Sequence, residues 1–183
     1  MLSYVESGVT AYYHAAPTLL QRIDRVQDRF LHELGVSAED AIEYYRLAPL
    51  TSRRDIGMLG LLHRIVLSEA PSQLGSLFPF APPDPETLFE IYSRSRLGVR
   101  RHNRQFQQPT FRTDVLHRSL FAVVVVHNLL PQEVVEHTRV KAFQSHLQFA
   151  LRNAARNRLA DWRYLFSPVI RPIRPTVFQS LFR

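Results

Sequence analysis

The stretch LFAVVVVHNLLP, residues 120–131, leaves the fold class open between a buried strand and a short buried helix. Seven apolar residues begin it, and the branched side chains of its four consecutive valines favour a strand. An unbroken apolar run also indicates burial on both faces, as in a parallel sheet. Yet the run has no turn signal before it and ends at Pro131, and seven apolar residues fit either element.

Three other segments have the periodicity of helices. Apolar residues recur at steps of three and four in 17–34, opposite a charged face, and Gly35 is a natural stop. Ser52 and Asp55 have the spacing of a capping box ahead of a segment that reaches residue 68. Apolar residues go nearly all round this segment, so we expect it to be buried centrally. With a third helix at 139–158, the chain is predicted to be mainly α, an irregular helical bundle.

Prolines divide the chain. Four of them between residues 78 and 86 exclude a helix or a central strand and predict a stiff linker. The tail carries three more, at Pro168, Pro172 and Pro175, and is expected to be loose or extended. The predicted division is a helical segment 1–77, a proline-rich linker 78–90, a basic helical region 91–166 and a flexible tail 167–183.

Composition limits the function classes. The apolar share of 45% and the charged share of 21% are those of a globular protein. The absence of cysteine excludes disulfides, thiol catalysis and zinc sites with cysteine ligands. No apolar run approaches the length of a membrane helix, and the first ten residues do not resemble a secretory signal. We therefore expect an intracellular protein, in the nucleus or cytoplasm, without a membrane partner.

Charge is distributed unevenly along the chain. The net charge is +7, and Lys141 is the only lysine among the 23 basic residues. Residues 1–90 contain 12 acidic and 7 basic side chains, a balance of −5, whereas residues 91–183 contain 4 acidic and 16 basic, a balance of +12. Such asymmetry predicts that the second half meets a polyanion.

No pattern in the chain predicts catalysis. The eight histidines form no metal-ligand pair, and there is neither a glycine-rich phosphate loop nor a GxSxG turn. Two-metal enzymes need paired carboxylates, and the only adjacent acidic pair, Glu39 and Asp40, is typical of the first turn of a helix after Ser37. We therefore expect no catalytic residue, no metal site and no cofactor.

Arginines provide the candidate binding site. Five occur within eleven residues of the stretch SRSRLGVRRHNRQF, and no acidic residue interrupts them. Guanidinium groups this close together repel one another unless solvent or an anion screens them, so the stretch is either a solvated loop or a contact to phosphates. Two arginines on the polar face of 139–158 offer a second contact. The candidate residues are Arg94, Arg96, Arg100, Arg101, Arg104, Arg152 and Arg156.

Three fragments in order resemble one family. Residues 4–15 and 19–35, YVESGVTAYYHA and LLQRIDRVQDRFLHELG, are similar to the thumb-like segment that follows the polymerase core in non-LTR retrotransposon reverse transcriptases of the jockey-like or a related lineage. Residues 47–65, LAPLTSRRDIGMLGLLHRI, resemble the next family motif. The resemblance covers about residues 4–151.

The third fragment, residues 94–106 with 118–147, resembles the family's terminal signature, which includes W-N-x-L-P. His127 stands where the family usually has tryptophan. The matching positions are Arg118, Ser119, Asn128, Leu130, Pro131, Val140, Phe143, Gln144 and Leu147. The resemblance implies that the valine run is a short buried helix, at about 119–129.

The resemblance also implies what this chain does not contain. The family's catalytic aspartates belong to an upstream F/Y-x-D-D hairpin, and no such sequence occurs here. We therefore expect the C-terminal part of an RNA-directed DNA polymerase that does not polymerise alone. It would act as an accessory region that binds the phosphate backbone of RNA or DNA, with the missing polymerase core as a further partner. The alternatives are a non-catalytic helical interaction module and a non-functional remnant of a mobile element.

Overall fold

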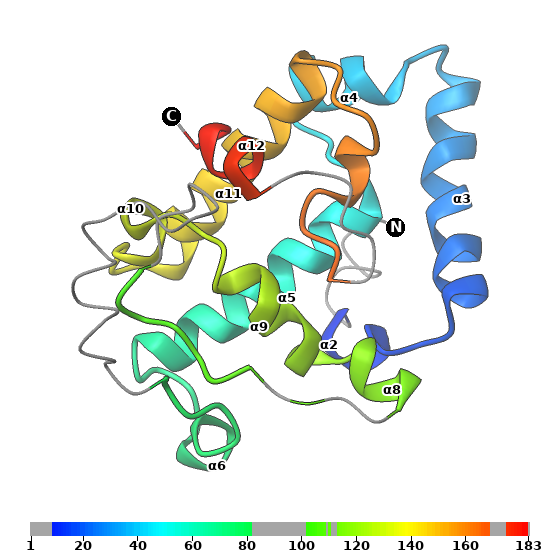
Figure 1. Ribbon diagram of the computed structural model, residues 1–183. Helices are drawn as coiled ribbons and strands as arrows, with labels where there is room; N and C mark the ends of the chain where they lie inside the picture. Colours follow the sequence, from blue (N-terminus) through cyan, green and yellow to red (C-terminus); the bar gives the residue numbers. More distant parts are fainter. Residues whose placement is uncertain (1–8, 82–101, 109, 111–112, 169–174, 183) are drawn as a thin grey trace.

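The computed structural model describes residues 9–81, 102–108, 110, 113–168 and 175–182, and Figure 1 shows their arrangement. Within these residues the chain is helical, without a β-strand, so the predicted mainly α class is confirmed. The elements are α2 (Val9–Tyr12), α3 (Pro17–Glu33), α4 (Ala38–Tyr44), α5 (Leu50–Val66), α6 (Ser72–Gly75), α8 (Asp114–His117), α9 (Leu120–His127), α10 (Gln132–Val135), α11 (Val140–Arg156), the 3-10 turn η1 (Trp162–Tyr164) and α12 (Pro175–Ser180).

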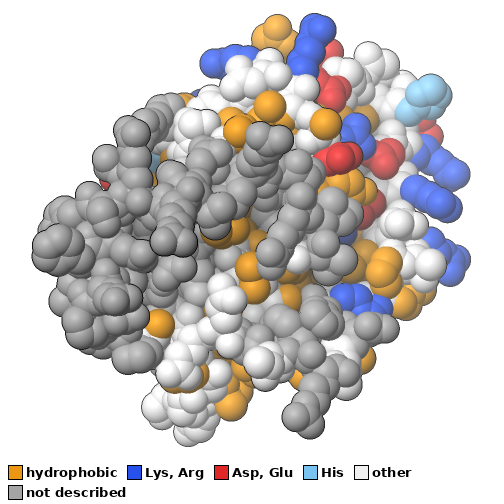
Figure 2. Space-filling view, in the orientation of Figure 1, with side chains coloured by type: hydrophobic (Ala, Val, Ile, Leu, Met, Phe, Trp, Pro, Cys, Tyr) orange, Lys and Arg blue, Asp and Glu red, His pale blue; other side chains and the backbone are white. Residues whose placement is uncertain are grey.

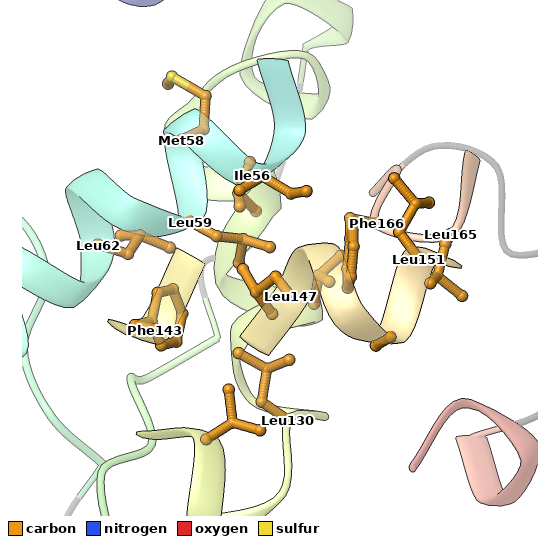
Figure 3. Close-up of a cluster of buried hydrophobic side chains, with 14 of the residues drawn as sticks. Ile56, Met58, Leu59, Leu62, Leu130, Phe143, Leu147, Leu151, Leu165 and Phe166 are labelled. Atoms are coloured by element: carbon orange, nitrogen blue, oxygen red, sulfur yellow. The ribbon is translucent and has the colours of Figure 1, made fainter. Parts of the chain in front are cut away.

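Helices α5 and α11 form the centre of the molecule. α5 is apolar nearly all round and packs against both α11 and α9. A methyl group at Gly60 would collide with the side-chain amide of Gln144 in α11, which would have to move aside. Figure 3 shows Leu59 of α5 beside Leu147 of α11 within the buried apolar cluster. The central position predicted for this helix is confirmed.

The valine run is the helix α9. Ser119 precedes it, and its hydroxyl accepts a hydrogen bond from the backbone N–H of Phe121 at 3.3 Å. Val123 and Val124 are completely buried. Their strand propensity is overridden because the core surrounds the run on several sides, and a helix satisfies its own backbone polar groups there.

The other predicted helices are confirmed to within two residues at each end, which is the normal uncertainty of a helix boundary. α3 is followed by Gly35 in the left-handed conformation, with φ of +66°. The Ser37 hydroxyl accepts a hydrogen bond from Asp40 N–H at 3.0 Å and caps α4. No helix among the described residues is both long and apolar enough to span a bilayer.

The predicted capping box of Ser52 and Asp55 is wrong. α5 begins after Pro49, so both residues lie inside the helix. The Ser52 hydroxyl donates a hydrogen bond to the carbonyl oxygen of Arg163 at 2.6 Å, and Asp55 accepts one from the Tyr13 hydroxyl at 2.8 Å. Both side chains connect α5 to neighbouring segments.

The two sides of the predicted linker share one core, and Phe78, at the start of that linker, belongs to it. Phe78 is buried, and Phe80 stacks on Phe106 with the ring centroids 5.0 Å apart. Residues 82–90 of the predicted linker lie outside the described residues. The prediction of a loose or extended tail is wrong for residues 175–182. α12 (Pro175–Ser180) and the turn that follows it bury three apolar side chains beside α11 (Figure 1). These are Phe178, Leu181 and Phe182.

Candidate functional site

Four of the seven predicted arginines, Arg94, Arg96, Arg100 and Arg101, lie outside the described residues. Arg104 is described, and its side chain is half-buried. Its guanidinium group donates a hydrogen bond to the carbonyl oxygen of Val135 at 3.0 Å. Arg104 therefore connects the end of the arginine-rich stretch to α10, a structural role that the sequence did not predict.

Arg152 and Arg156 lie one turn apart on the same face of α11, as predicted. Arg156 is 62% exposed and forms an ion pair with Glu43 of α4. Arg152 is half-buried, and its Nε has no hydrogen-bond partner among the described residues. An anion that binds Arg156 therefore competes with a carboxylate that is already in place.

An open hollow of about 810 Å³ lies beside Arg156. Two arginines line it together with three acidic side chains, so its charge is mixed. The indole N–H of Trp162 donates a hydrogen bond to Glu39 at 3.1 Å and fixes one of these carboxylates. The hollow does not have the uniformly positive surface that a phosphate chain prefers. Its charged residues are Glu39, Asp40, Glu43, Arg156 and Arg158.

The C-terminal end of the arginine-rich stretch is held by the end of α9, where residues 102–106 contact residues 127–128. Asn128 donates a hydrogen bond to the carbonyl oxygen of Phe106 at 2.8 Å and accepts one from Phe106 N–H at 3.0 Å. His102 Nδ1 accepts a hydrogen bond from Arg104 N–H at 3.1 Å, so its Nε2 carries the proton and donates to the carbonyl oxygen of His127 at 3.0 Å. This joint, residues 102–106 with 127–128, gives the stretch a fixed point of attachment.

The histidines of the joint are neutral packing residues. Burial lowers the pKa of His102 to about 4 and lowers the pKa of His127 well below its ordinary value. Neither ring nitrogen of His127 has a hydrogen-bond partner among the described residues. His63 is also buried, with its pKa lowered by burial, and stacks on Phe143 at 4.0 Å between ring centroids. None of these three carries a proton that could serve acid catalysis near neutral pH.

A cluster of four polar side chains, Tyr13, Asp24, Arg54 and Asp55, lies near the start of α5. Asp55 accepts the hydrogen bond from Tyr13, while Arg54 donates two hydrogen bonds to Asp24 at 2.6 and 2.8 Å. Burial raises the pKa of Asp55 to about 7, and its Oδ2 has no partner among the described residues. The four side chains line a pocket of about 200 Å³ together with Tyr164 and others.

Sequence reasoning missed this pocket because it assigned Asp55 to a helix cap. The available signal was a pair of adjacent opposite charges, Arg54 and Asp55, in a helix whose other residues are mostly apolar. A buried carboxyl with a raised pKa is a common feature of functional sites and also of structural ion-pair networks. No group of three or more histidine, aspartate or glutamate side chains suited to a metal ion occurs in the described part of the chain.

Comparison of the chain with models of protein families, with curated proteins and with solved structures finds no match.

Proposed function

We propose that the chain is the C-terminal part of a non-LTR retrotransposon reverse transcriptase and that it contributes binding of the nucleic-acid backbone, without catalysis. Its resemblance to that family in three successive fragments supports the parentage. Several residues of the third fragment also have structural roles around the end of α9 and the start of α10. Asn128 binds the backbone of Phe106, Leu130 is buried in the core, and Pro131 begins α10.

The observation that carries the proposal is the attachment of the arginine-rich stretch at the joint. Residues 91–183 have a balance of +12, and the stretch that concentrates this charge ends at His102 and Phe106, which are held by buried hydrogen bonds. A guanidinium group pairs two phosphate oxygens at once, so a series of them suits a phosphate backbone. Few aromatic side chains accompany the arginines, so we expect no sequence preference and little base stacking.

A salt titration tests this function. The full chain is mixed with fluorescein-labelled single-stranded RNA and with duplex DNA of unrelated sequences, and fluorescence anisotropy is measured at increasing potassium chloride. If the four arginines within residues 94–101 each displace one counterion, log affinity falls against log salt with a slope of roughly −2.8 to −3.6. Binding that is absent at low salt, or that does not respond to salt, would contradict the proposal.

A helical interaction module is the second candidate function, and one observation favours it. Helix α3 has a row of exposed apolar side chains, which is unusual for a helix of a monomeric protein. As an interaction module, the chain functions through a protein partner. As part of a reverse transcriptase, its proposed protein partner is the polymerase core of the parent protein.

A further inference from the structure

Helix α3 leaves much of its apolar surface uncovered. Leu19, Val26 and Phe30 of α3 and Leu34, which follows its last residue, are 51%, 53%, 47% and 59% exposed, and together they form the apolar stripe of α3. Their spacing of seven, four and four residues places them on one side of the helix. Within the 17 residues of α3 only Gln27 and Leu31 are buried. Figure 1 shows α3 along one edge of the molecule.

Polar contacts, together with the buried side chain of Leu31, attach α3 to the rest of the protein. Asp24 accepts two hydrogen bonds from Arg54, and Asp28 lies 3.6 Å from Arg163. Gln27 donates a hydrogen bond to the carbonyl oxygen of Ala48 at 3.1 Å. These contacts turn the polar residues 24, 27 and 28 toward the rest of the protein, and the apolar stripe consequently faces outward.

These contacts occupy the two aspartates of α3 and leave its arginines without partners among the described residues. Both aspartates are paired with arginines of other elements, whereas Arg22, Arg25 and Arg29 have no ion pair or hydrogen bond through their side chains in the described part of the chain. At 100° per residue these three arginines form a row directly beside the apolar stripe. The exposed Glu33 lies at the C-terminal end of the same row, which keeps a net positive charge. A shallow hollow of about 420 Å³ is lined by the three arginines and Glu33 on one side and by Val26 and Phe30 on the other. Figure 2 shows basic side chains along the edge where α3 lies, with hydrophobic side chains exposed nearby.

We propose that this face of α3 docks an amphipathic helix of another protein, and that the flank of that helix beside the arginine row is acidic. An apolar stripe next to a row of unpaired arginines is complementary to an apolar stripe next to glutamates or aspartates. α3 has 17 residues and is about 25 Å long, so the docked helix would have four to five turns. The proposal does not depend on nucleic-acid binding.

A second copy of the chain fits this face poorly. In an antiparallel pair of α3 helices, the arginine row of one copy lies beside the same row of the other. Each row has three arginines and the single acidic residue Glu33, so the net interaction between the rows is repulsive. In a parallel pair, the arginine row of one copy faces the opposite flank of α3 in the other copy. That flank already contacts the rest of the protein, so it is not free to pair with the arginines. A nucleic acid would use the arginines but would leave the apolar stripe in water.

Two designed helical peptides test the proposal. Both have leucines spaced to match the apolar stripe; one carries glutamates along its flank, and the other carries lysines in their place. We expect the full chain to bind the glutamate peptide about tenfold more tightly, as measured by fluorescence anisotropy, because three exposed ion pairs each contribute a small free energy. The triple variant R22E/R25E/R29E should reverse this preference. The variant R64E/R139E/K141E, which changes the net charge equally at exposed basic residues elsewhere, should retain it.

The variant V26D/F30D should remove peptide binding while the circular-dichroism melting curve stays unchanged, because both side chains are exposed. Equal affinity for the two peptides, or an unchanged preference in R22E/R25E/R29E, would overturn the proposal. Sedimentation that shows a dimer of the wild-type chain, abolished in V26D/F30D, would assign the face to a second copy instead. Competition between RNA and the glutamate peptide for α3, lost in R22E/R25E/R29E, would assign the row to nucleic acid.

Discussion

Asn128 binds both backbone polar groups of Phe106, donating to its carbonyl oxygen and accepting from its N–H. The two residues are 22 positions apart in sequence, and both are buried. The amide therefore replaces the hydrogen bonds that a neighbouring strand would supply to an extended segment. This contact joins the end of α9 to the segment that follows the arginine-rich stretch.

The substitution Asn128→Ala should destabilise the protein by about 2–4 kcal/mol, because it leaves a buried N–H and a buried carbonyl oxygen without partners. The free energy of unfolding in urea measures the effect. Gln132→Ala is the matched control, since its hydrogen bonds to Asn103 are exposed, and it should cost less than about 1 kcal/mol. An equal decrease in the free energy of unfolding in the two variants would show that the Asn128–Phe106 hydrogen bonds do not stabilise the fold more than an exposed contact does.

The arginine-rich stretch should separate into binding and structural residues. Replacing Arg100 and Arg101 by alanine should make the salt slope of nucleic-acid binding shallower by roughly 1.4–1.8 and leave stability unchanged. Arg104→Ala should instead reduce stability by about 1–3 kcal/mol, because the Arg104 guanidinium donates to the Val135 carbonyl. Salt titrations and urea unfolding of both variants measure the two effects. A slope unaffected by R100A/R101A would identify the stretch as a solvated loop.

Buried His127 at the joint should cause loss of stability in acid. The pKa of His127 is lowered in the folded state, so below pH 6.5 the unfolded chain takes up a proton that the folded chain does not. Its contribution is fully present above pH 6.5 and is lost as the pH falls, by about 1.4 kcal/mol per pH unit. His127→Phe should make this loss less steep by that amount, and at neutral pH it should stabilise the protein because no unpaired ring nitrogen remains. Urea unfolding across the acid range tests both; an unchanged pH dependence would contradict the assignment.

Asp55 should have the opposite pH dependence. Its pKa rises from 3.8 to about 7 on folding, so in this range the folded chain holds a proton that the unfolded chain has released. The stability associated with the carboxyl is full below pH 3.8 and is lost as the pH rises through about 7. Asp55→Asn removes this change. Relative to the wild type it should become more stable on going from about pH 5 to about pH 8, by on the order of 1 kcal/mol or more. Equilibrium unfolding of both proteins at the two pH values is the measurement, and a constant difference would contradict the raised pKa.

The chain is expected to extend no primer on an RNA template in the presence of Mg²⁺. Polymerases hold two metal ions with paired carboxylates, and the sequence contains no motif of that kind. A primer-extension assay with the full chain measures the activity, with an active reverse transcriptase as the positive control. Extension that disappears in an aspartate variant of this chain would show that the assignment of a non-catalytic region is wrong.

The sequence by itself determined the helices α3, α5 and α11. Their apolar residues recur with the period of a helix, and this periodicity is a local property that no distant contact has to supply. The all-round apolar character of α5 similarly predicted its central position. Only the family resemblance predicted that the valine run forms α9, because its residue types favoured a strand.

Only the tertiary structure decided which partners the polar side chains meet. Ser52 and Asp55 had the spacing of a cap, but their partners, Arg163 and Tyr13, lie 111 and 42 positions away in sequence. The contacts of Asp24 and Asp28 with Arg54 and Arg163 likewise turn the apolar stripe of α3 outward, although the stripe itself was evident in the sequence. Periodicity shows that a helix has an apolar side. Which side is covered depends on distant charges and carbonyl groups that become neighbours only on folding.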